Sequence, residues 1–364
     1  MLWCFGMPKV AILKTSPQTI IDDYKRLIHL VEYEKCLSCE RDLILKLNLS
    51  WTKYFPSCST EPWQLDGVLN CLIEDGFLPS KLFPVENKTV VTNTLKGASD
   101  NKWLSILKKY HLKFISLPEV EWTVFKFKER LLVIDKIFPE GILIPKMFIG
   151  KDILHLPTIK THGHSITTGA IKNAFGGLLK EFRHYAHKYI HEALVDLLIM
   201  QKELHPGIFA VMDGCVAGDG AGPRTMIPRI KNVLLASSDS VAIDAVSAKL
   251  MGFEPMEIPY IKMANDMGLG VGKIKDIELV GDIDTINENW NFKVKRSPVI
   301  FVDQMIRKGF LQRFERILLH SPLWRWAPIA SNFYHDILWY PTIGRIRINK
   351  FMKTEWGKLF RSYE

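Results

Sequence analysis

The strongest constraint on the fold is an alternation of short apolar runs and amphipathic runs in the first third of the chain. Short apolar runs are strand candidates, and apolar side chains at helical spacing indicate helices. The elements expected in order are a strand at 9–14, a helix at 17–33, a strand at 42–49, a helix at 62–75, a strand at 88–94, a helix at 101–110 and a strand at 113–117. Such alternation predicts a mostly parallel sheet with helices on both faces.

Residues 120–150 interrupt this alternation with β-rich sequence, which predicts an antiparallel excursion or an edge of the sheet. The alternation then resumes. The later expected elements are a strand at 152–156, helices at 169–182 and 191–201, strands at 208–212 and 232–236, helices at 241–251 and 258–267, and a strand at 276–280. We therefore predict one α/β core domain over residues 1–290.

Composition restricts the class of protein. Hydrophobic residues make up 47% of the chain and charged residues 24%, which is typical of a globular protein. No apolar run reaches the roughly 18–20 residues that a membrane-spanning helix needs, and the N-terminal sequence predicts a first strand rather than a signal peptide. The 6 cysteines show no regular spacing, which favours free thiols in a reducing compartment. We expect a cytoplasmic protein.

The net charge of +9 is concentrated at the C-terminal end of the chain. Residues 297–364 hold eleven Lys or Arg and five Asp or Glu, a balance of +6, among Trp residues and apolar residues at helical spacing. Because the remainder is nearly neutral, we do not expect nucleic-acid binding. We predict that residues 297–364 form a basic, aromatic, mainly helical extension. It either packs on the core or mediates self-association, or it contacts an anionic membrane surface peripherally.

The segment 158–177, TIKTHGHSITTGAIKNAFGG, is the most informative for function. It places Lys160, His162, Lys172 and Asn173 in a short stretch flanked by apolar residues, and Lys and helix N-terminal amides favour carboxylate or phosphate oxygens. We expect Thr167–Gly169 to begin a helix whose amides face the same point as the lysines.

Other polar residues lie at or just after predicted strand ends. In doubly wound sheets, ligands bind beyond the carboxyl ends of the strands, so such residues are expected to converge there. They are Lys46, Asn48, Lys160, His162, Asp213 and Asp239. Either His162 or His164 is expected to act as a general acid or base, because an imidazole titrates near neutrality, and the other is expected to be hydrogen-bonded structure.

Several of these residues also have structural interpretations. Lys46 could be a surface lysine at a strand end, and Asp239 in SSDS is well placed as a helix N-cap. His184, His187 and His191 have a spacing that places them on one helix face, either as metal ligands or as a hydrated surface. The glycines of AGDGAGP, which include Gly222, resemble a phosphate-binding loop only loosely, because no Walker lysine follows.

Residues 8–282 resemble the family known as domain of unknown function family 362, whose members are often described as iron–sulfur-associated proteins. The resemblance rests on ordered pieces. They are Lys46-Leu47-Asn48, Lys160-Thr161-His162, Gly169-Ala170-Ile171-Lys172-Asn173 with Gly176, Asp213-Gly214, Gly222-Pro223, the block ASSDSVAIDAVSAKLMG at 236–252, Gly268-Leu269-Gly270 and Val280-Gly281. The resemblance implies a Rossmann-like sheet without a settled activity, and it adds Asp244 to the positions of interest.

Many members of that family carry closely spaced cysteine quartets, whereas here only Cys36 and Cys39 form a close pair. A four-cysteine cluster needs its thiolates brought together. We interpret the pair as a turn containing two thiols, with zinc or an iron–sulfur site as alternatives, and we assign neither a metal site nor a cofactor.

Two functions remain open. The first is an enzyme for a small anionic substrate, with Lys160, His162 and Lys172 as catalytic residues. Its expected substrate-binding residues are Lys46, Asn48, Asn173, Asp213, Gly222 and Asp239. The second is a non-catalytic binding protein or an accessory protein for redox or cofactor assembly.

Overall fold

The computed structural model describes residues 7–320 and 326–363, and a ten-stranded mixed sheet lies at its centre. The strand order is β12-β1-β11-β10-β7-β2-β3-β4, with β8 paired to β10 and β9 paired to β8. Six of the nine strand pairs are parallel. The strands are β1 Lys9–Lys14, β2 Leu43–Lys46, β3 Leu82–Glu86, β4 Ile115–Ser116, β7 Asp152–His155, β8 Thr158–His162, β9 Ile166–Thr168, β10 Ile208–Ala221, β11 Thr225–Ser237 and β12 Glu278–Gly281.

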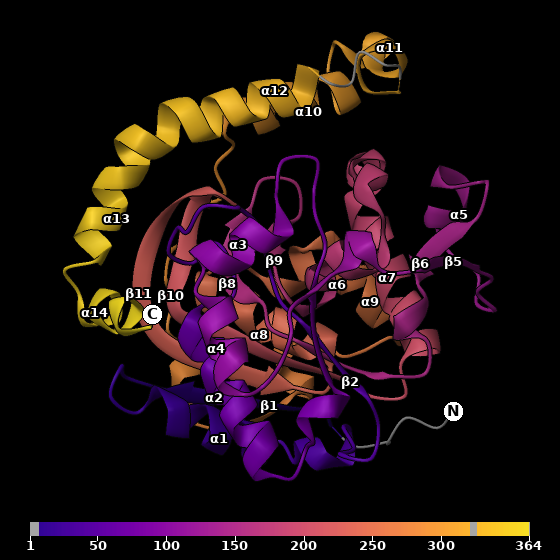
Figure 1. Cartoon of the computed structure of the whole chain (residues 1–364). Helices are drawn as coiled ribbons and strands as arrows, with labels where there is room; N and C mark the ends of the chain where they lie inside the picture. Colours follow the sequence, from indigo (N-terminus) through magenta and orange to yellow (C-terminus); the bar gives the residue numbers. More distant parts are fainter. Residues whose placement is uncertain (1–6, 321–325, 364) are drawn as a thin grey trace.

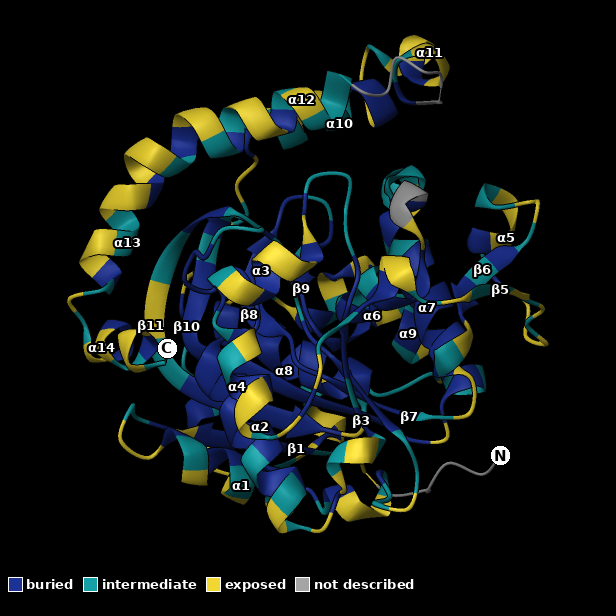
Figure 2. Cartoon of the chain, viewed as in Figure 1, coloured by how far each residue is buried: buried dark blue, intermediate teal, exposed yellow. Residues whose placement is uncertain are grey.

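Both faces of the sheet are buried under helices, as the alternation of strands and helices predicts (Figure 1). Successive side chains of a strand point to opposite faces. Accordingly Val10 and Ile12 of β1 join one apolar cluster, and Ala11 and Leu13 join the other. Figure 2 shows most of the central strands as buried, with an exposed stretch in β11.

The helices divide between these two clusters. The first cluster contains apolar side chains of α6 Ala170–Leu178, α7 Ile190–Leu204, α8 Ser240–Met251 and α9 Pro259–Asp266. The second contains those of α1 Ile20–Leu30, α2 Pro62–Glu74 and α4 Trp103–Lys109, with the short α3 Thr94–Asp100 before α4. A mostly parallel α/β fold is therefore confirmed.

The β-rich interruption forms a separate antiparallel pair, β5 Trp122–Phe125 and β6 Ile142–Pro145, with the short helix α5 Ile134–Ile137 between them. Of the two alternatives for residues 120–150, the structure therefore has the antiparallel excursion.

The strand expected at 88–94 is wrong, because the strand there is β3, Leu82–Glu86. β3 contains Pro84. Because proline lacks the N–H group that strand pairing uses, the sequence did not indicate a strand there. Thr89 and Thr92 have the β-branched character of a strand. However, the N–H of Thr89 donates to Oγ1 of Thr92 at 2.7 Å, a local bond that competes with strand pairing.

The strands expected at 208–212 and 232–236 are parts of a much longer hairpin. β10 has 14 residues and β11 has 13, and they remain paired as far as Ala221 and Thr225. The AGDGAGP glycines thus belong to the end of a hairpin. They lack the strand–loop–helix arrangement of a Walker-type phosphate loop, because β10 is followed by another strand.

The extension is helical, as expected, and curves around one side of the core as a long arm (Figure 1). Its elements are α10 Pro298–Lys308, α11 Glu315–His320, α12 Trp326–Asn332, the π-helical segment η11 Phe333–Gly344, α13 Arg345–Phe351 and α14 Glu355–Ser362. Among the helices in the described part of the chain, none combines the length and the apolar character that a membrane crossing requires.

The arm packs on the core through aromatic side chains. The Trp356 ring lies 4.9 Å from that of Trp63, and its indole N–H donates to Asn232 Oδ1 at 2.8 Å. Nearer the middle of the arm, the Trp339 ring lies 5.3 Å from that of Phe55. These contacts hold the helices of the extension over one end of the sheet.

Candidate functional site

A cavity of about 270 Å³ lies between the core and the arm. Three of its residues, Lys46, Glu86 and His162, are the last residues of β2, β3 and β8. The carboxyl ends of parallel strands meet at one edge of a sheet, which is the usual ligand position in such folds. The arm supplies the opposite wall through Asp303, Arg307 and other side chains of α10 and α12.

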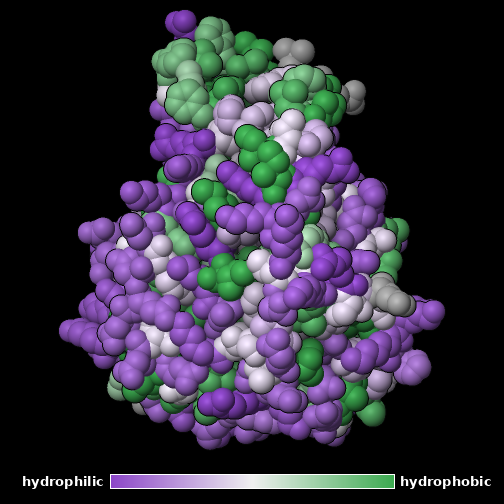
Figure 3. Space-filling view, turned by 90° about the vertical axis from the view of Figure 1, so that its left-hand side faces the viewer, coloured by the Kyte–Doolittle hydropathy of each residue, from purple (hydrophilic) through white to green (hydrophobic). Residues whose placement is uncertain are grey.

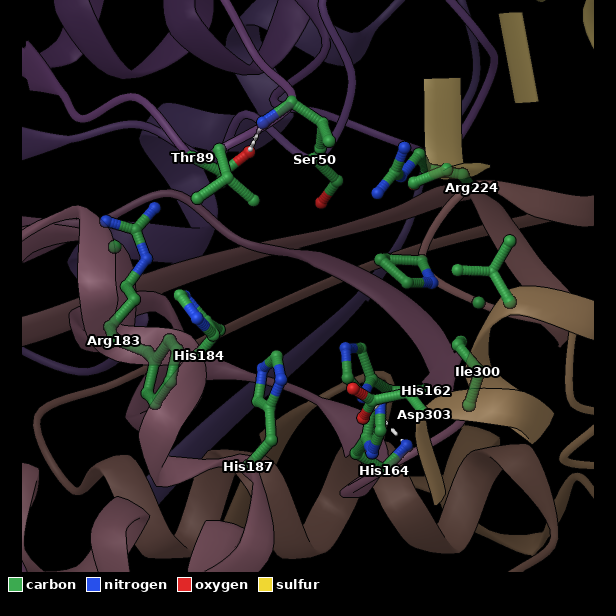
Figure 4. Close-up of a pocket in the computed structure, with 18 of the residues that line it drawn as sticks. Ser50, Thr89, His162, His164, Arg183, His184, His187, Arg224, Ile300 and Asp303 are labelled. Atoms are coloured by element: carbon green, nitrogen blue, oxygen red, sulfur yellow. Dashed lines mark hydrogen bonds and ion pairs between the residues drawn. The ribbon is translucent and has the colours of Figure 1, made fainter. Parts of the chain in front are cut away.

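The cavity wall carries more positive than negative groups. It is lined by five cationic side chains and two carboxylates, with five histidines among them. The cations are Lys46, Lys172, Arg183, Arg224 and Arg307; the carboxylates are Glu86 and Asp303; the histidines are His162, His164, His184, His187 and His335. Figure 4 shows Arg183 and His184 on one side of the cavity and Arg224 on the other, with His162, His164 and Asp303 close together.

Lys46 is buried and neutralised by an ion pair, so it is not a surface lysine. Its Nζ donates to Glu86 Oε1 at 2.7 Å and to the carbonyl oxygen of Leu47 at 2.6 Å, and the side chains of both partners of the pair are at most 3% exposed. Burial lowers the pKa of Lys46, while Glu86 opposes that shift. Glu86 therefore offsets the charge of Lys46, one of the five cations.

Lys172, on α6, has no such partner. Within the described residues its Nζ forms no hydrogen bond or ion pair, and its recorded contact is with the Phe175 ring, 5.5 Å from the centroid. Burial, followed by repulsion from Lys160, Arg183 and Lys46, lowers the pKa of Lys172 to about 7. Close to neutral pH this amine can therefore either hold or release a proton.

Two guanidinium groups also present unused donors. Arg307 is 2% exposed and donates from Nε to Asp303 Oδ2 at 2.8 Å. In the described part of the chain, neither Nη1 of Arg307 nor Nη1 of Arg224 has a hydrogen-bond acceptor. Buried donors without acceptors are costly, so these groups favour an anionic ligand in the cavity.

Lys160 lies behind the cavity wall and does not line it. Its Nζ donates to Asn48 Oδ1 at 2.5 Å, Thr158 Oγ1 at 2.6 Å and the carbonyl oxygen of Cys58 at 2.9 Å, and the residue is 0% exposed. Burial lowers its pKa to about 8. Since all three ammonium donors are used, this geometry suits Lys160 to positioning Asn48 rather than to contact with a ligand.

Asn48 and Asn173 continue the same hydrogen-bond network into the cavity wall. Asn48 Nδ2 donates to Asn173 Oδ1 at 3.3 Å, and Asn173 Nδ2 donates to the carbonyl oxygen of Lys46 at 2.9 Å. The network therefore links Lys160 through both amides to the end of β2, and it fixes how the two amides face the cavity.

His162 has a defined tautomer when neutral. Its Nδ1 accepts hydrogen bonds from the backbone N–H groups of His164, at 3.2 Å, and Ser165, at 3.3 Å. An Nδ1 that accepts cannot carry the proton, so the neutral ring is protonated at Nε2. Burial and then Lys172 hold the pKa of His162 well below its usual value. His162 is thus suited to donate a hydrogen bond to an anion from Nε2.

The donor atoms of His164, His187 and Asp303 lie within 4.8 Å of one another, close enough for one metal ion. However, Asp303 is already paired with Arg307, and the other cations of the cavity oppose a metal cation. The stacked rings of His164 and His187, 4.7 Å apart, also suit packing. A second group, His29, Cys71 and Asp75, is linked internally, because Asp75 Oδ2 accepts from the Cys71 thiol at 3.4 Å and bonds His29 Nε2 at 2.7 Å.

Asp213 and Asp239, both expected to bind substrate, do not line the cavity. Asp213 is fully buried and accepts from the Tyr24 hydroxyl at 2.6 Å and the Trp63 indole N–H at 2.8 Å. Asp239 caps α8 through the backbone N–H groups of Val241 and Ala242, as its alternative interpretation predicted. Gly222 does line the cavity, at the tip of the β10–β11 hairpin.

The amides at the N-terminus of α6 were expected to face the same point as Lys160 and Lys172. This expectation is wrong. These amide groups are used by Asp244, whose Oδ1 accepts from Ala170 N at 2.6 Å and whose Oδ2 accepts from Ile171 N at 3.4 Å. A Cβ at Gly169 would lie 2.0 Å from Asp244 Oδ1, which explains the glycine there. The positive end of this helix is already occupied by a carboxylate.

The sequence did not identify Glu86, Arg183, Arg224, Asp303 or Arg307 as site residues. Asp303 and Arg307 are four residues apart, a spacing that predicts an ion pair on a helix. However, the neighbouring sequence does not indicate that this helix packs over the sheet. The three spaced histidines do not share one role either. His184 and His187 line the cavity, whereas the His191 ring stacks with Tyr260 at 6.1 Å.

Cys36 and Cys58 do not line the cavity, and their thiols bond to backbone carbonyl groups. The Cys36 thiol donates to the carbonyl oxygen of Ile208 at 3.1 Å, and the Cys58 thiol donates to that of Pro223 at 3.1 Å. Burial raises the pKa of Cys36 to about 11 and that of Cys58 to about 12. In this part of the structure, these two thiols are oriented by carbonyl groups.

Comparison with known proteins gives a family and more distant similarities. The family model described as "Domain of unknown function (DUF362)" matches residues 43–249. A thylakoid-associated protein of Synechocystis is 26% identical over 176 residues, which cover 46% of this chain and 55% of that protein. The chain thus matches about half the length of this relative. A crystal structure of a Thermotoga maritima protein shares 13% identity with a TM-score of 0.39, over 62% of this chain and 57% of that one.

Proposed function

Since the chain belongs to the DUF362 family, which is defined by sequence and not by a known reaction, we propose a function from its cavity. The protein is an enzyme that binds a small substrate carrying a carboxylate or phosphate group. The observation that carries this proposal is Lys172, a cation without an ion-pair or hydrogen-bond partner among the described residues, in a wall with five cations and two carboxylates.

Anion binding would relieve several unfavourable features at once. It would compensate Lys172 and supply acceptors to Nη1 of Arg224 and Nη1 of Arg307. Charge-assisted hydrogen bonds of guanidinium groups to carboxylate or phosphate are among the strongest in proteins. The cavity of about 270 Å³ is at the small end of ligand sites and suits a small molecule.

Two cavity groups can move or hold a proton. In the cavity without a ligand, the pKa of Lys172 is lowered to about 7, so a part of the amine is neutral near pH 7. When Arg224 and Arg307 hold the anionic group, this neutral amine can accept a proton from a carbon or oxygen next to it. The His162 Nε2–H can donate a hydrogen bond to the oxygen on which negative charge develops. Lys160 has a positioning role through Asn48.

The first test is the thermal stability of the protein in titrations with phosphate, sulfate and malonate. Ligands that bind the native state raise the melting temperature in a saturable way. Lys172→Met should abolish this rise. Lys113→Met, at an exposed loop lysine, is the matched control and should retain it. An unchanged anion response in Lys172→Met would contradict the proposal.

A second variant separates catalysis from binding. Lys172→Arg keeps the positive charge but cannot act as a proton acceptor, because a guanidinium stays protonated. It should retain the anion response and lose exchange of substrate protons for deuterium in D₂O, measured by NMR with a panel of small carboxylates and phosphates. If the wild type binds anions but exchanges no proton in any of them, the alternative is favoured, a binding or cofactor-assembly accessory protein.

For location, we infer a cytoplasmic protein with peripheral membrane contact. The irregular cysteine spacing favours a reducing compartment. The name of the cyanobacterial relative places that protein at a thylakoid, which supports membrane contact. Fractionation of cells that express the tagged full chain tests this location.

A further inference from the structure

The outer side of the arm exposes an unusual number of large apolar side chains. Eleven of the twenty-one large apolar residues that are exposed in the described structure lie between 301 and 346. Ile329, Phe333 and Ile337 are four residues apart on one continuous helical stretch and are 68%, 53% and 61% exposed, and Ile346 is 70% exposed. Figure 3 shows hydrophobic side chains gathered over the upper part of the molecule, above a mostly hydrophilic body. Exposed apolar groups in such a concentration mark an interaction surface.

The carboxylates of the arm have partners, whereas many of its cations are exposed. All three carboxylates between residues 298 and 353 have partners on or near the core side. Asp303 pairs with Arg307, Glu315 pairs with Lys188 of η5 (Glu181–Tyr189) at 2.6 Å, and Asp336 accepts from the Trp51 indole at 2.7 Å. Six cations in the same range are exposed: Lys308, Arg313, Arg316, Arg345, Lys350 and Lys353. Within the described residues of this range, the exposed charges are therefore all positive.

This combination selects one kind of partner. A second copy docked through the same face would place its cations against cations. Nucleic acid would match the charge but would not bury the apolar side chains. An anionic bilayer surface matches both, because its headgroups attract cations and its acyl boundary accepts apolar side chains. We propose that the outer face of residues 301–320 and 326–353 docks the protein on the surface of an anionic membrane.

The docking is peripheral and keeps the fold intact. The inner side of the arm is held by Trp339 and Trp356 against the core, so the arm lies along the surface without leaving its place. Helix α10 of the arm forms part of the cavity wall through Asp303 and Arg307. Docking would therefore hold the cavity next to the bilayer. The proposal rests on the outer face alone and is independent of the reaction in the cavity.

Flotation of the full chain with vesicles tests the proposal. The vesicles are phosphatidylcholine alone or phosphatidylcholine with phosphatidylglycerol. The wild type should float with the second kind and lose most of this binding at high salt. The triple variant Phe333→Ser, Ile337→Ser, Ile346→Ser should partition at least about tenfold more weakly, since burial of apolar side chains adds to the electrostatic attraction.

Two matched variants complete the test. The first is a control triple variant, Leu78→Ser, Leu95→Ser, Val124→Ser. It removes apolar side chains of similar exposure that lie elsewhere, and it should bind vesicles like the wild type. The second is the charge variant Arg345→Gln, Lys350→Gln, Lys353→Gln. It should bind anionic vesicles more weakly than the wild type does, and this binding should depend less on salt. Circular dichroism of each variant confirms folding.

Two outcomes would overturn the proposal. One is that the wild type fails to float with anionic vesicles, or floats no better than the arm triple variant. The other is a concentration-dependent dimer, detected by light scattering, that the arm triple variant loses, because it would assign the face to a second copy of the chain.

Discussion

Lys172 shows how the surroundings of one residue set its chemistry. Its amine is surrounded by Lys160, Arg183 and Lys46, and burial together with these charges lowers its pKa to about 7. The unfolded chain has the ordinary value of about 10.5. The charged amine therefore costs stability at every pH below about 7, and this cost disappears as pH rises to the unfolded value.

We therefore expect Lys172→Met to stabilise the ligand-free protein most at or below neutral pH. The gain should be on the order of 1 kcal/mol or more, since each unit of pKa difference corresponds to about 1.4 kcal/mol. It should shrink as pH rises from about 7 toward 10.5. Urea denaturation of both proteins across this window measures it, and a difference that does not change with pH would refute the argument. Lys113→Met should show no such trend.

At the scale of elements, the last helix, α14, attaches the end of the arm to the core. Trp356 of α14 is 2% exposed, lies against Trp63 of α2 and donates to Asn232 in β11. The Phe360 ring, one turn further, stacks on Tyr54 at 3.7 Å. Two strongly buried aromatic contacts thus connect the end of the chain with its first quarter.

Trp356→Ala should lower the free energy of unfolding by about 3 kcal/mol or more, as is usual when a buried tryptophan is removed. Trp356→Phe keeps most of the packing and loses the hydrogen bond to Asn232. It should therefore lower the free energy of unfolding clearly less than Trp356→Ala does. Denaturant titrations of the two variants give the comparison. Equal and small effects would mean that α14 contributes little to the fold.

At the scale of the whole molecule, the arm and the core are one structure with one cavity between them. Trp51, Phe55, Trp339 and Met226 form a shared apolar cluster, and Arg347 Nη1 of α13 donates to the carbonyl oxygen of Met226 at 2.6 Å. The arm therefore contributes both to stability and to the cavity wall.

Deletion of residues 297–364 should lower the melting temperature and the solubility, because it exposes Trp51, Phe55 and Trp63. It should also weaken the anion response, since Arg307 is lost from the cavity. Thermal shift measurements with and without phosphate test both effects. A truncated protein with the melting temperature and the phosphate response of the full chain would show that the arm is an independent appendage.

The local structure was largely predictable from the sequence. The limits of β1 agree with the prediction, and α2 ends just before Gly76, which has a φ of +91°. α8 lies between the Asp239 cap and Gly252, where φ is +96°. Caps, turns and apolar periodicity depend on residues within about ten positions, so the sequence carries them directly. For the same reason Lys46, Asn48 and His162 could be placed at strand ends, and the structure brings them to the cavity.

Only the tertiary structure decided which charges meet. Lys46 faces Glu86, Asp244 takes the α6 amides, and Arg307 reaches the cavity from the arm. The sequence placed Lys160, like Lys46, at or just after the end of a predicted strand. However, its bonds to Asn48, Thr158 and Cys58 turn it away from the cavity. Such pairings depend on the order of the strands and on where a distant helix packs. Desolvation and Coulomb interactions depend on all neighbours in space, and neighbours along the chain determine only a part of them.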